Sequence, residues 1–213
     1  MSSRSLVVVS AGLGQPSSTR LLADRLSAAT ERHLRDAGFE STVEVVELRD
    51  HAQDLVNHLL TGFPSPRLQA AIDAVTAADG LIAATPIFSA SYSGLFKVFV
   101  DGLDRDGLAG KPVLLAATGG TARHSLALEH AMRPLFAYFG MTSVPSAVYA
   151  ASEDWGPARV AVDGGLVARI DRAARELAAA MASRTAAVRP DRFSDPIPFE
   201  QLLPGSPGSR PER

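Results

Sequence analysis

The chain has 213 residues, of which 46% are hydrophobic and 21% charged, as in an ordinary soluble globular domain. A formal net charge of −2 shows no basic excess, which argues against nucleic acid or an anionic membrane as a partner. Cysteine is absent, so this chain has no disulfides, thiolate metal sites or thiol redox chemistry, and any redox activity needs a cofactor.

The first predicted element is a buried strand from Leu6 to Val9, a continuous apolar run typical of parallel sheets. The run is too short for a signal peptide or a membrane span, so we expect a cytoplasmic protein. A loop rich in glycine and hydroxyl side chains follows at residues 10–20. Beyond it, residues at helical spacing predict a helix that stops at Gly38: Leu22, Leu26, Ala29 and His33.

Residues 42–48 alternate between apolar and polar side chains, which predicts a half-buried edge strand. Residues 51–66 predict a short helix and a turn, before a second helix at about 68–77. The apolar run from Leu81 to Ala84 predicts a central strand that enters a small-polar loop. The helix after that loop, around residues 95–100, is apolar almost all round, which indicates a subunit interface.

The last third of the chain predicts a buried strand at 112–118, a helix, an edge strand at 144–149 that contains Pro145, and a final helix. Two stripes mark the helices: Leu128, Met132, Leu135 and Phe139, then Leu166, Ile170, Ala173, Leu177 and Met181. Strand and helix thus alternate five times, which predicts an α/β, flavodoxin-like three-layer sandwich with a five-stranded parallel sheet in the order 2-1-3-4-5. We expect this domain to span residues 1–185 and a proline-rich C-terminal arm to span 186–213.

Ligands of open α/β sheets bind at the carboxyl ends of the strands, where three loops carry candidate residues. In the first loop, hydroxyls and a helix N-terminus predict a phosphate site; the alternative is that Ser17 or Ser18 merely caps the helix. Its candidate ligands are Ser10, Ser17, Ser18 and Thr19.

In the second loop, Pro86, Ile87 and Phe88 offer a rigid, apolar wall to a flat ligand, and Ser91 or Ser93 can cap the next helix. In the third loop, two adjacent glycines let the backbone approach a planar ring. Its candidate residues are Thr118, Gly119, Gly120 and Thr121. His124 follows, either as a ligand contact or as a capping or surface histidine. The histidines elsewhere lack metal-ligand spacing, so no metal site is expected.

Taken together, Thr85-Pro86-Ile87-Phe88 and residues 91–97 resemble the second flavin loop of the NADPH-dependent FMN reductases. Residues 10–22 resemble the family's phosphate loop and residues 111–140 its third loop and following helix. The octapeptide 118–125 is the most specific part, and it resembles the subfamily that supplies reduced flavin to luciferase-like monooxygenases. The resemblance covers residues 5–182 and implies that Pro86 to Phe88 and Thr118 to Thr121 pack on opposite sides of the isoalloxazine of FMN.

The resemblance implies hydride transfer from NADPH or NADH to FMN, with reduced flavin passed to a partner monooxygenase. It names no catalytic side chain, because the cofactors supply the chemistry. The expected assembly is a homodimer or homotetramer. Other functions stay open: a reductase of quinones or azo dyes with bound FMN, a flavodoxin-like electron carrier, or a hydrolase or phosphate-binding module that uses the first loop alone. Carriers are usually strongly acidic, which disfavours that alternative at a charge of −2.

Overall fold

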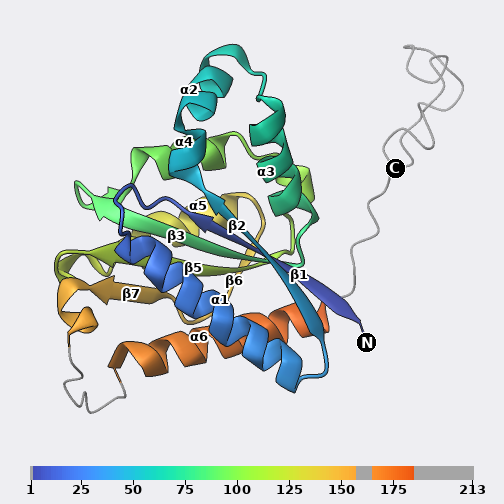
Figure 1. Ribbon diagram of the computed structural model, residues 1–213, viewed down its shortest axis with the longest axis vertical. Coiled ribbons are helices and arrows are strands. Elements are labelled where there is room, and N and C mark those ends of the chain that lie inside the picture. Colours follow the sequence, from blue (N-terminus) through green and yellow to red (C-terminus); the bar gives the residue numbers. More distant parts are fainter. Residues whose placement is uncertain (1, 157–164, 185–213) are drawn as a thin grey trace, which may run out of the picture.

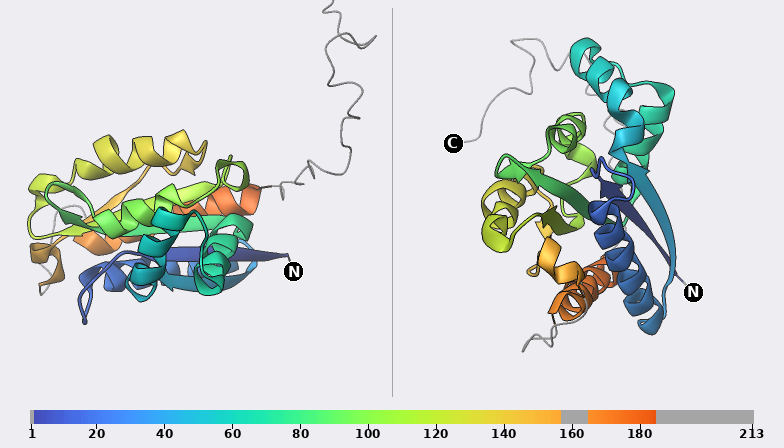
Figure 2. Two further views of the ribbon diagram at one scale, coloured as in Figure 1. Left: turned by 90° about the horizontal axis from the view of Figure 1, so that it is seen from above. Right: turned by 60° about the vertical axis from the view of Figure 1, so that its left-hand side comes forward.

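The protein is described here by a computed structural model covering residues 2–156 and 165–184. Its sheet lies between two layers of helices (Figures 1 and 2), as in a three-layer sandwich. Helices α1 and α6 pack on one face of the sheet, and α3, α4 and α5 cover the other. The proposed arm at 186–213 lies outside the described residues.

Parallel strands run through the sheet in the order β2-β1-β3-β5, and β6 and β7 each pair in parallel with β5. This confirms the expected 2-1-3-4-5 arrangement, with two additions: the last position is divided between β6 and β7, and a two-residue β4 pairs antiparallel with β3. The strand bounds are β1 Ser3–Ser10, β2 Glu40–Glu47, β3 Gly80–Phe88, β4 Ser91–Tyr92, β5 Pro112–Gly119, β6 Thr142–Ser143 and β7 Val148–Ala151.

The helices predicted from apolar spacing are all present. Their bounds are α1 Ser18–Asp36, α2 Ala52–Thr61, α3 Pro66–Ala77, α4 Gly94–Asp101, α5 Arg133–Tyr138 and α6 Gly165–Ser183. Short 3-10 helices span Leu48–His51, Arg105–Gly107, Ala122–His124 and Ser152–Trp155. The stripe that begins at Leu128 is not purely α-helical, because Leu128–Met132 forms a π-helical turn before α5. No helix in the described ranges combines the length and the apolar character needed to span a membrane.

The core is divided by the sheet, since alternate residues of each strand point to opposite faces. Val7 and Val9 face the side covered by α3 to α5, where Phe96, Phe99 and Phe136 are buried. The opposite face packs against α1 and α6, and all five residues of the predicted final stripe are buried there: Leu166, Ile170, Ala173, Leu177 and Met181. Burying both faces explains why β1, β3 and β5 read as continuous apolar runs.

The interruption between β6 and β7 has a local cause. Pro145 has no N–H to donate to β5, so the ladder cannot continue through it. Side chains bond the exposed backbone instead: Arg133 donates to the carbonyl oxygens of Val144 and Pro145, each at 3.2 Å, and the Glu176 carboxylate accepts from the N–H of Ser146 at 2.6 Å. The strand expected at 144–149 therefore forms only at its carboxyl end, as β7.

Lys111, just before β5, is fully buried. Its ammonium group donates to the carbonyl oxygens of Val75 and, at 2.9 Å, Thr76, near the C-terminus of α3. Carbonyls at a helix C-terminus carry partial negative charge, so a cation is favoured there. Lys111 thus ties the start of β5 to the end of α3.

Candidate functional site

The three candidate loops meet at one edge of the sheet, because β1, β3 and β5 are parallel neighbours whose carboxyl ends point the same way (Figure 1). Ser10, the last residue of β1, is in register with Ala84 of β3, and Pro86 of β3 is in register with Thr118 of β5. This is the edge at which doubly wound sheets bind ligands.

The first loop presents unused hydrogen-bonding groups. Ser10 is fully buried, and its hydroxyl has no hydrogen-bond partner among the described residues. The backbone N–H groups of Ser18 and Thr19, in the first turn of α1, likewise donate no bond within the described ranges. A buried hydroxyl without a partner costs free energy, and a helix N-terminus attracts anions. The loop therefore fits a phosphate group.

Ser17 and Ser18 differ in their surroundings. Ser17 is the N-cap of α1, and its hydroxyl oxygen accepts a hydrogen bond from the N–H of Arg20 at 3.1 Å. A Cβ atom on Gly12 would lie 2.0 Å from that oxygen, so a side chain there would displace the capping hydroxyl. Ser18 is exposed at the start of the helix. The capping interpretation thus holds for Ser17, whereas the Ser18 side chain makes no hydrogen bond among the described residues.

Charged side chains brace the first loop from the end of β2. Arg20 forms ion pairs with Asp24 at 2.7 Å and with Glu47 at 2.5 Å, and the hydrogen bond to Asp24 raises the pKa of Arg20. Arg49 pairs with Glu47 at 3.0 Å and donates to the carbonyl oxygen of Gly14 at 3.0 Å. Because two carboxylates neutralise Arg20, the attraction of this loop for an anion comes from N–H groups and hydroxyls.

The second loop is a tight hairpin between β3 and β4. Pro86 is buried, Ile87 is half-buried, and Phe88 is 48% exposed at the end of the strand. Ser89 and Ala90 form the tip, with φ angles of 48° and 70°, which only glycine adopts without strain. The apolar wall thus forms the end of β3, and β4 fixes its conformation by pairing with Ile87 and Phe88.

Ser93, rather than Ser91, caps the helix after the hairpin. The Ser93 hydroxyl accepts from the N–H of Phe96 at 3.2 Å, and its own N–H donates to the Thr85 hydroxyl at 3.1 Å. Ser91 pairs with Phe88 in β4 and is half-buried. Of the two serines predicted to cap the helix, only Ser91 therefore keeps a hydroxyl that is free of a capping bond.

The third loop is connected to the first through a buried contact. The hydroxyl oxygens of Thr118 and Thr19 lie 2.7 Å apart, which joins the end of β5 to the first turn of α1. The backbone N–H groups of Gly120 and Thr121 donate no hydrogen bond within the described residues, and both residues are exposed. These donors are free for the polar edge of a planar ligand.

Tyr149 lies beneath the third loop and is absent from the residues predicted for the site. Its hydroxyl donates to the carbonyl oxygen of Thr121 at 2.9 Å, and burial raises the pKa of its phenol. The sequence indicated only that this residue ends an apolar edge strand. A buried tyrosine at the carboxyl end of a strand that flanks the site was the available signal.

His124 ends the 3-10 helix Ala122–His124, directly after the third loop, and its side chain is exposed. It does not cap that helix, whose N-cap is Thr121. In the described part of the chain, no cluster of three or more His, Cys, Asp or Glu side chains could hold a metal ion.

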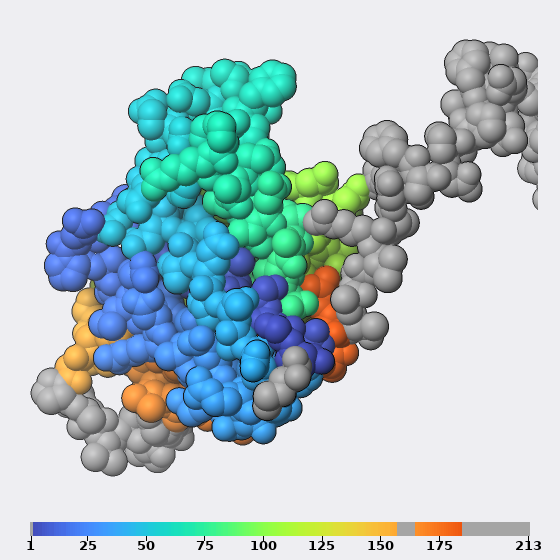
Figure 3. Space-filling model, turned by 45° about the vertical axis from the view of Figure 1, so that its right-hand side comes forward, coloured from blue at the N-terminus to red at the C-terminus, as the bar shows by residue number. Residues whose placement is uncertain are grey.

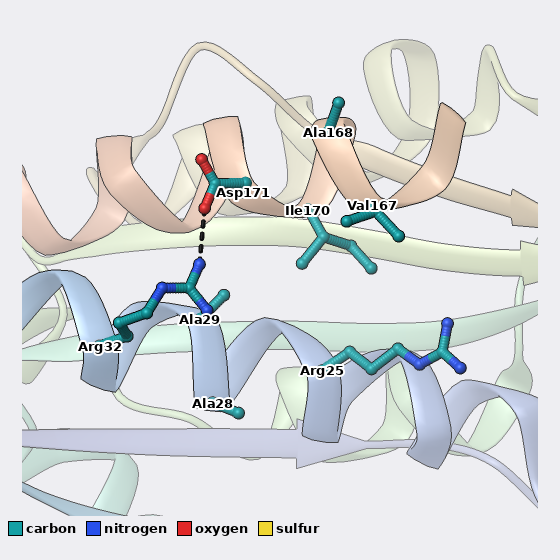
Figure 4. Close-up of a pocket in the computed structure, with 8 residues that line it drawn as sticks. All are labelled: Arg25, Ala28, Ala29, Arg32, Val167, Ala168, Ile170 and Asp171. Carbon is teal, nitrogen blue, oxygen red and sulfur yellow. Dashed lines mark hydrogen bonds and ion pairs between the residues drawn. The ribbon is translucent and has the colours of Figure 1, made fainter. Parts of the chain in front are cut away.

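A separate hollow of about 600 Å³ lies between α1 and α6, away from these loops (Figure 4). Arg32 pairs with Asp171 across it at 2.6 Å, and Asp171 also accepts from His33 at 3.0 Å. The hydrogen bond from His33 lowers the pKa of Asp171. None of the residues that line this hollow belongs to the three loops, so it is not the predicted site.

Comparison with known proteins places these features in a family. Residues 5–156 match the family model described as NADPH-dependent FMN reductase. An FMN reductase (NADPH) from Pseudomonas aeruginosa is 39% identical over 180 residues, which cover 84% of this chain and 94% of that protein. An NADH-dependent FMN reductase, SfnF, from Pseudomonas fluorescens is 38% identical over 173 residues, covering 81% of this chain and 89% of that protein.

The crystal structure of an oxidoreductase from Corynebacterium diphtheriae superposes with a TM-score of 0.82 at 43% identity, and the match covers 87% of this chain and all of that one. The family match over residues 5–156 includes all three loops and the strands that position them. The chain belongs to the NADPH-dependent FMN reductase family.

Proposed function

We propose that the protein transfers a hydride from NADPH or NADH to FMN and releases reduced flavin to a partner monooxygenase. The observation that carries this proposal is the convergence of three loops on one sheet edge, with the unpaired buried hydroxyl of Ser10 in the first. Relatives named for NADPH and for NADH resemble the chain almost equally, which is why both donors enter the proposal.

The chain itself supplies binding and orientation. We assign the phosphate of FMN to Ser10, Ser17, Ser18 and Thr19, together with the N-terminus of α1. We assign Pro86, Ile87 and Phe88 to one side of the isoalloxazine ring, with Ser91 beside them. The opposite side is assigned to Thr118, Gly119, Gly120 and Thr121, with His124 at the rim.

When bound, FMN supplies the redox chemistry as the acceptor of the hydride. The residues around it then need no acid–base role. Free N–H groups of Gly120 and Thr121 would bond the polar edge of the ring, and the apolar hairpin would exclude water from one side. The chemistry depends on distance and stacking more than on any single side chain.

We also propose that the protein works in the cytoplasm as a homodimer or homotetramer. An exposed apolar surface supports the assembly: Leu59, Leu60 and Phe63, on α2 and just beyond it, are 61%, 78% and 81% exposed. Helices α2 and α3 project from the rest of the molecule (Figure 3), and α4, with half-buried Leu95 and Val98, packs beside α2. Contiguous apolar patches of this kind mark interfaces.

The assembly proposal predicts that light scattering gives at least twice the mass of one chain at micromolar concentration. The double variant Leu60→Asp/Phe63→Asp should give the mass of one chain. Val167→Asp, at an exposed position on α6, is the matched control and should leave the mass unchanged. A wild-type protein that is monomeric at this concentration contradicts the proposal.

The function is tested by aerobic oxidation of NADPH and NADH at increasing FMN, with an absorbance spectrum of the protein as purified. Saturable dependence on added FMN with a colourless protein supports a reductase that uses FMN as substrate. A yellow protein that turns over only with a quinone or azo dye indicates a reductase with bound FMN instead. A yellow protein that fails to oxidise either donor indicates an electron carrier, and no effect of flavin at all overturns the proposal.

A further inference from the structure

Tyr149 occupies the space that a side chain on Gly119 would need. A Cβ atom on Gly119 would lie 2.0 Å from the Tyr149 hydroxyl oxygen and 3.1 Å from the ring carbon that bears it. It would also lie 3.8 Å from the Cβ of Ile87, in the second loop. The phenol therefore ends where the second and third loops meet, although it comes from β7 at the edge of the sheet.

The Tyr149 hydroxyl also fixes the direction of the third loop. It donates to the carbonyl oxygen of Thr121, so that carbonyl turns down toward β7. The N–H groups of Gly120 and Thr121 keep no partner within the described residues. One hydrogen bond thus holds the end of the loop on the protein side, and the N–H groups of the two preceding peptide units stay available to a ligand.

Tyr149 is itself held in place from α6. Arg169 donates to the carbonyl oxygen of Tyr149 at 2.5 Å and pairs with Asp154 at 2.5 Å. The other carboxylate oxygen of Asp154 accepts from the N–H of Ala151, the last residue of β7, at 2.8 Å. This network fixes the strand end that carries the phenol, so the hydroxyl has a stable position from which to bond the loop.

We propose that Tyr149 is a positioning residue for the flavin ring: its hydroxyl sets the conformation of the third loop, and Gly119 is glycine because that hydroxyl occupies the place of a side chain. The inference rests on the proposed function, since the ring that the loop would bond belongs to FMN. It adds a residue outside the three loops and assigns a reason to one glycine within them.

The test compares Tyr149→Phe with Tyr138→Phe, the same chemical change at an exposed tyrosine on α5. Binding of FMN is measured by quenching of flavin fluorescence, alongside KM for FMN, kcat and the visible spectrum of bound flavin. Loss of one hydrogen bond that orders the loop should weaken FMN roughly fivefold to tenfold in Tyr149→Phe. We expect kcat at saturating FMN to stay within about twofold, the spectrum to shift, and Tyr138→Phe to behave as wild type.

A double-mutant cycle with Gly119→Ala tests the contact directly. In the wild-type background the added methyl group meets the hydroxyl, so the third loop must move and FMN should bind far more weakly. In Tyr149→Phe the 2.0 Å contact is gone, and the same substitution should cost less affinity. Additive costs of the two substitutions would show that the hydroxyl does not occupy the place of a side chain on Gly119.

Each outcome decides between the proposals. Unchanged FMN affinity and spectrum in Tyr149→Phe, or an equal cost of Gly119→Ala in both backgrounds, overturns the positioning role while the reductase function stands. A parallel loss of kcat and melting temperature without a selective loss of FMN affinity also overturns it. A wild-type protein that neither binds nor reduces FMN overturns the proposed function, which the wild-type measurement alone reveals.

Discussion

Ser10 is the residue whose surroundings in the free protein point most directly to a ligand. Its buried, unpaired hydroxyl contributes nothing to the stability of the free chain, so Ser10→Ala should leave the melting temperature unchanged or slightly higher. If the hydroxyl bonds a phosphate, the same change should weaken FMN by about 1.5–3 kcal/mol, roughly tenfold to hundredfold, and leave riboflavin nearly unaffected. Titrations of both ligands check this, with Ser27→Ala, buried on α1, as the control. Equal losses for FMN and riboflavin would show that Ser10 does not contact the phosphate.

Tyr149 also gives a prediction about alkaline pH. Burial raises the pKa of its phenol above the ordinary value of 10.0. Below that pH the phenol is neutral in both folded and unfolded chains. As pH rises further, the unfolded chain ionises first, so the stability linked to this group is progressively lost until the pKa in the folded state is passed. Tyrosinate absorbance during an alkaline titration should show a late step in wild type that is missing in Tyr149→Phe. A titration curve with the same late step in both proteins would contradict the assignment.

At the scale of elements, two glycine substitutions, one in the β3–β4 hairpin and one in α1, should change the free energy of unfolding in opposite directions. Ala90 has a φ of 70°, where a side chain costs roughly 1–2 kcal/mol, so Ala90→Gly should raise the free energy of unfolding by about 0.5–1 kcal/mol after the entropy cost of glycine. Ala28→Gly, at an exposed position inside α1, should lower it by about 1 kcal/mol. Urea denaturation measures both. Destabilisation by Ala90→Gly would mean that the tip is not strained.

The elements that the sequence predicts well are those whose own residues determine them. Continuous apolar runs identified β1, β3 and β5, and apolar stripes identified α1 and α6. The hairpin was not predicted, because Ser89-Ala90 lacks the Asn-Gly type of signature that such turns normally carry. The division of the last strand depends on Arg133 and Glu176, which bond its backbone from distant helices, and no local pattern reveals such contacts.

The same distinction applies to the site. Loop residues could be proposed from the carboxyl ends of predicted strands, since strand order alone brings those ends together. Which serine caps each helix, and which hydroxyl stays unpaired, depends on differences of a few tenths of an ångström in atomic positions. Tyr149 was missed for the same reason, because its contact with Thr121 joins residues 28 positions apart.

For the whole molecule, we propose that residues 1–185 form a flavodoxin-like FMN-binding domain and that 186–213 form a proline-rich C-terminal arm. About 87% of this chain covers the whole of the Corynebacterium structure, which supports a domain shorter than the full chain. A chain ended after residue 185 should therefore fold with an unchanged melting temperature and bind FMN as the full chain does, as measured by scanning calorimetry and fluorescence quenching. Loss of cooperative unfolding in the shortened chain would show that the arm belongs to the core.

Because the ammonium group of Lys111 is buried, the two lysines of the folded chain should differ strongly in their reactivity toward amine reagents. The sequence contains only two lysines, and the other, Lys97, has a 40% exposed side chain on α4. Reagents that acylate amines should modify Lys97 in the native protein, whereas Lys111 reacts only when the end of α3 separates from β5. The rate of acylation at Lys111, followed by mass spectrometry, therefore measures how often the end of α3 separates from the start of β5. A dye or a surface coupled through lysine would attach to the native fold at Lys97, in the first turn of α4 beside the second loop.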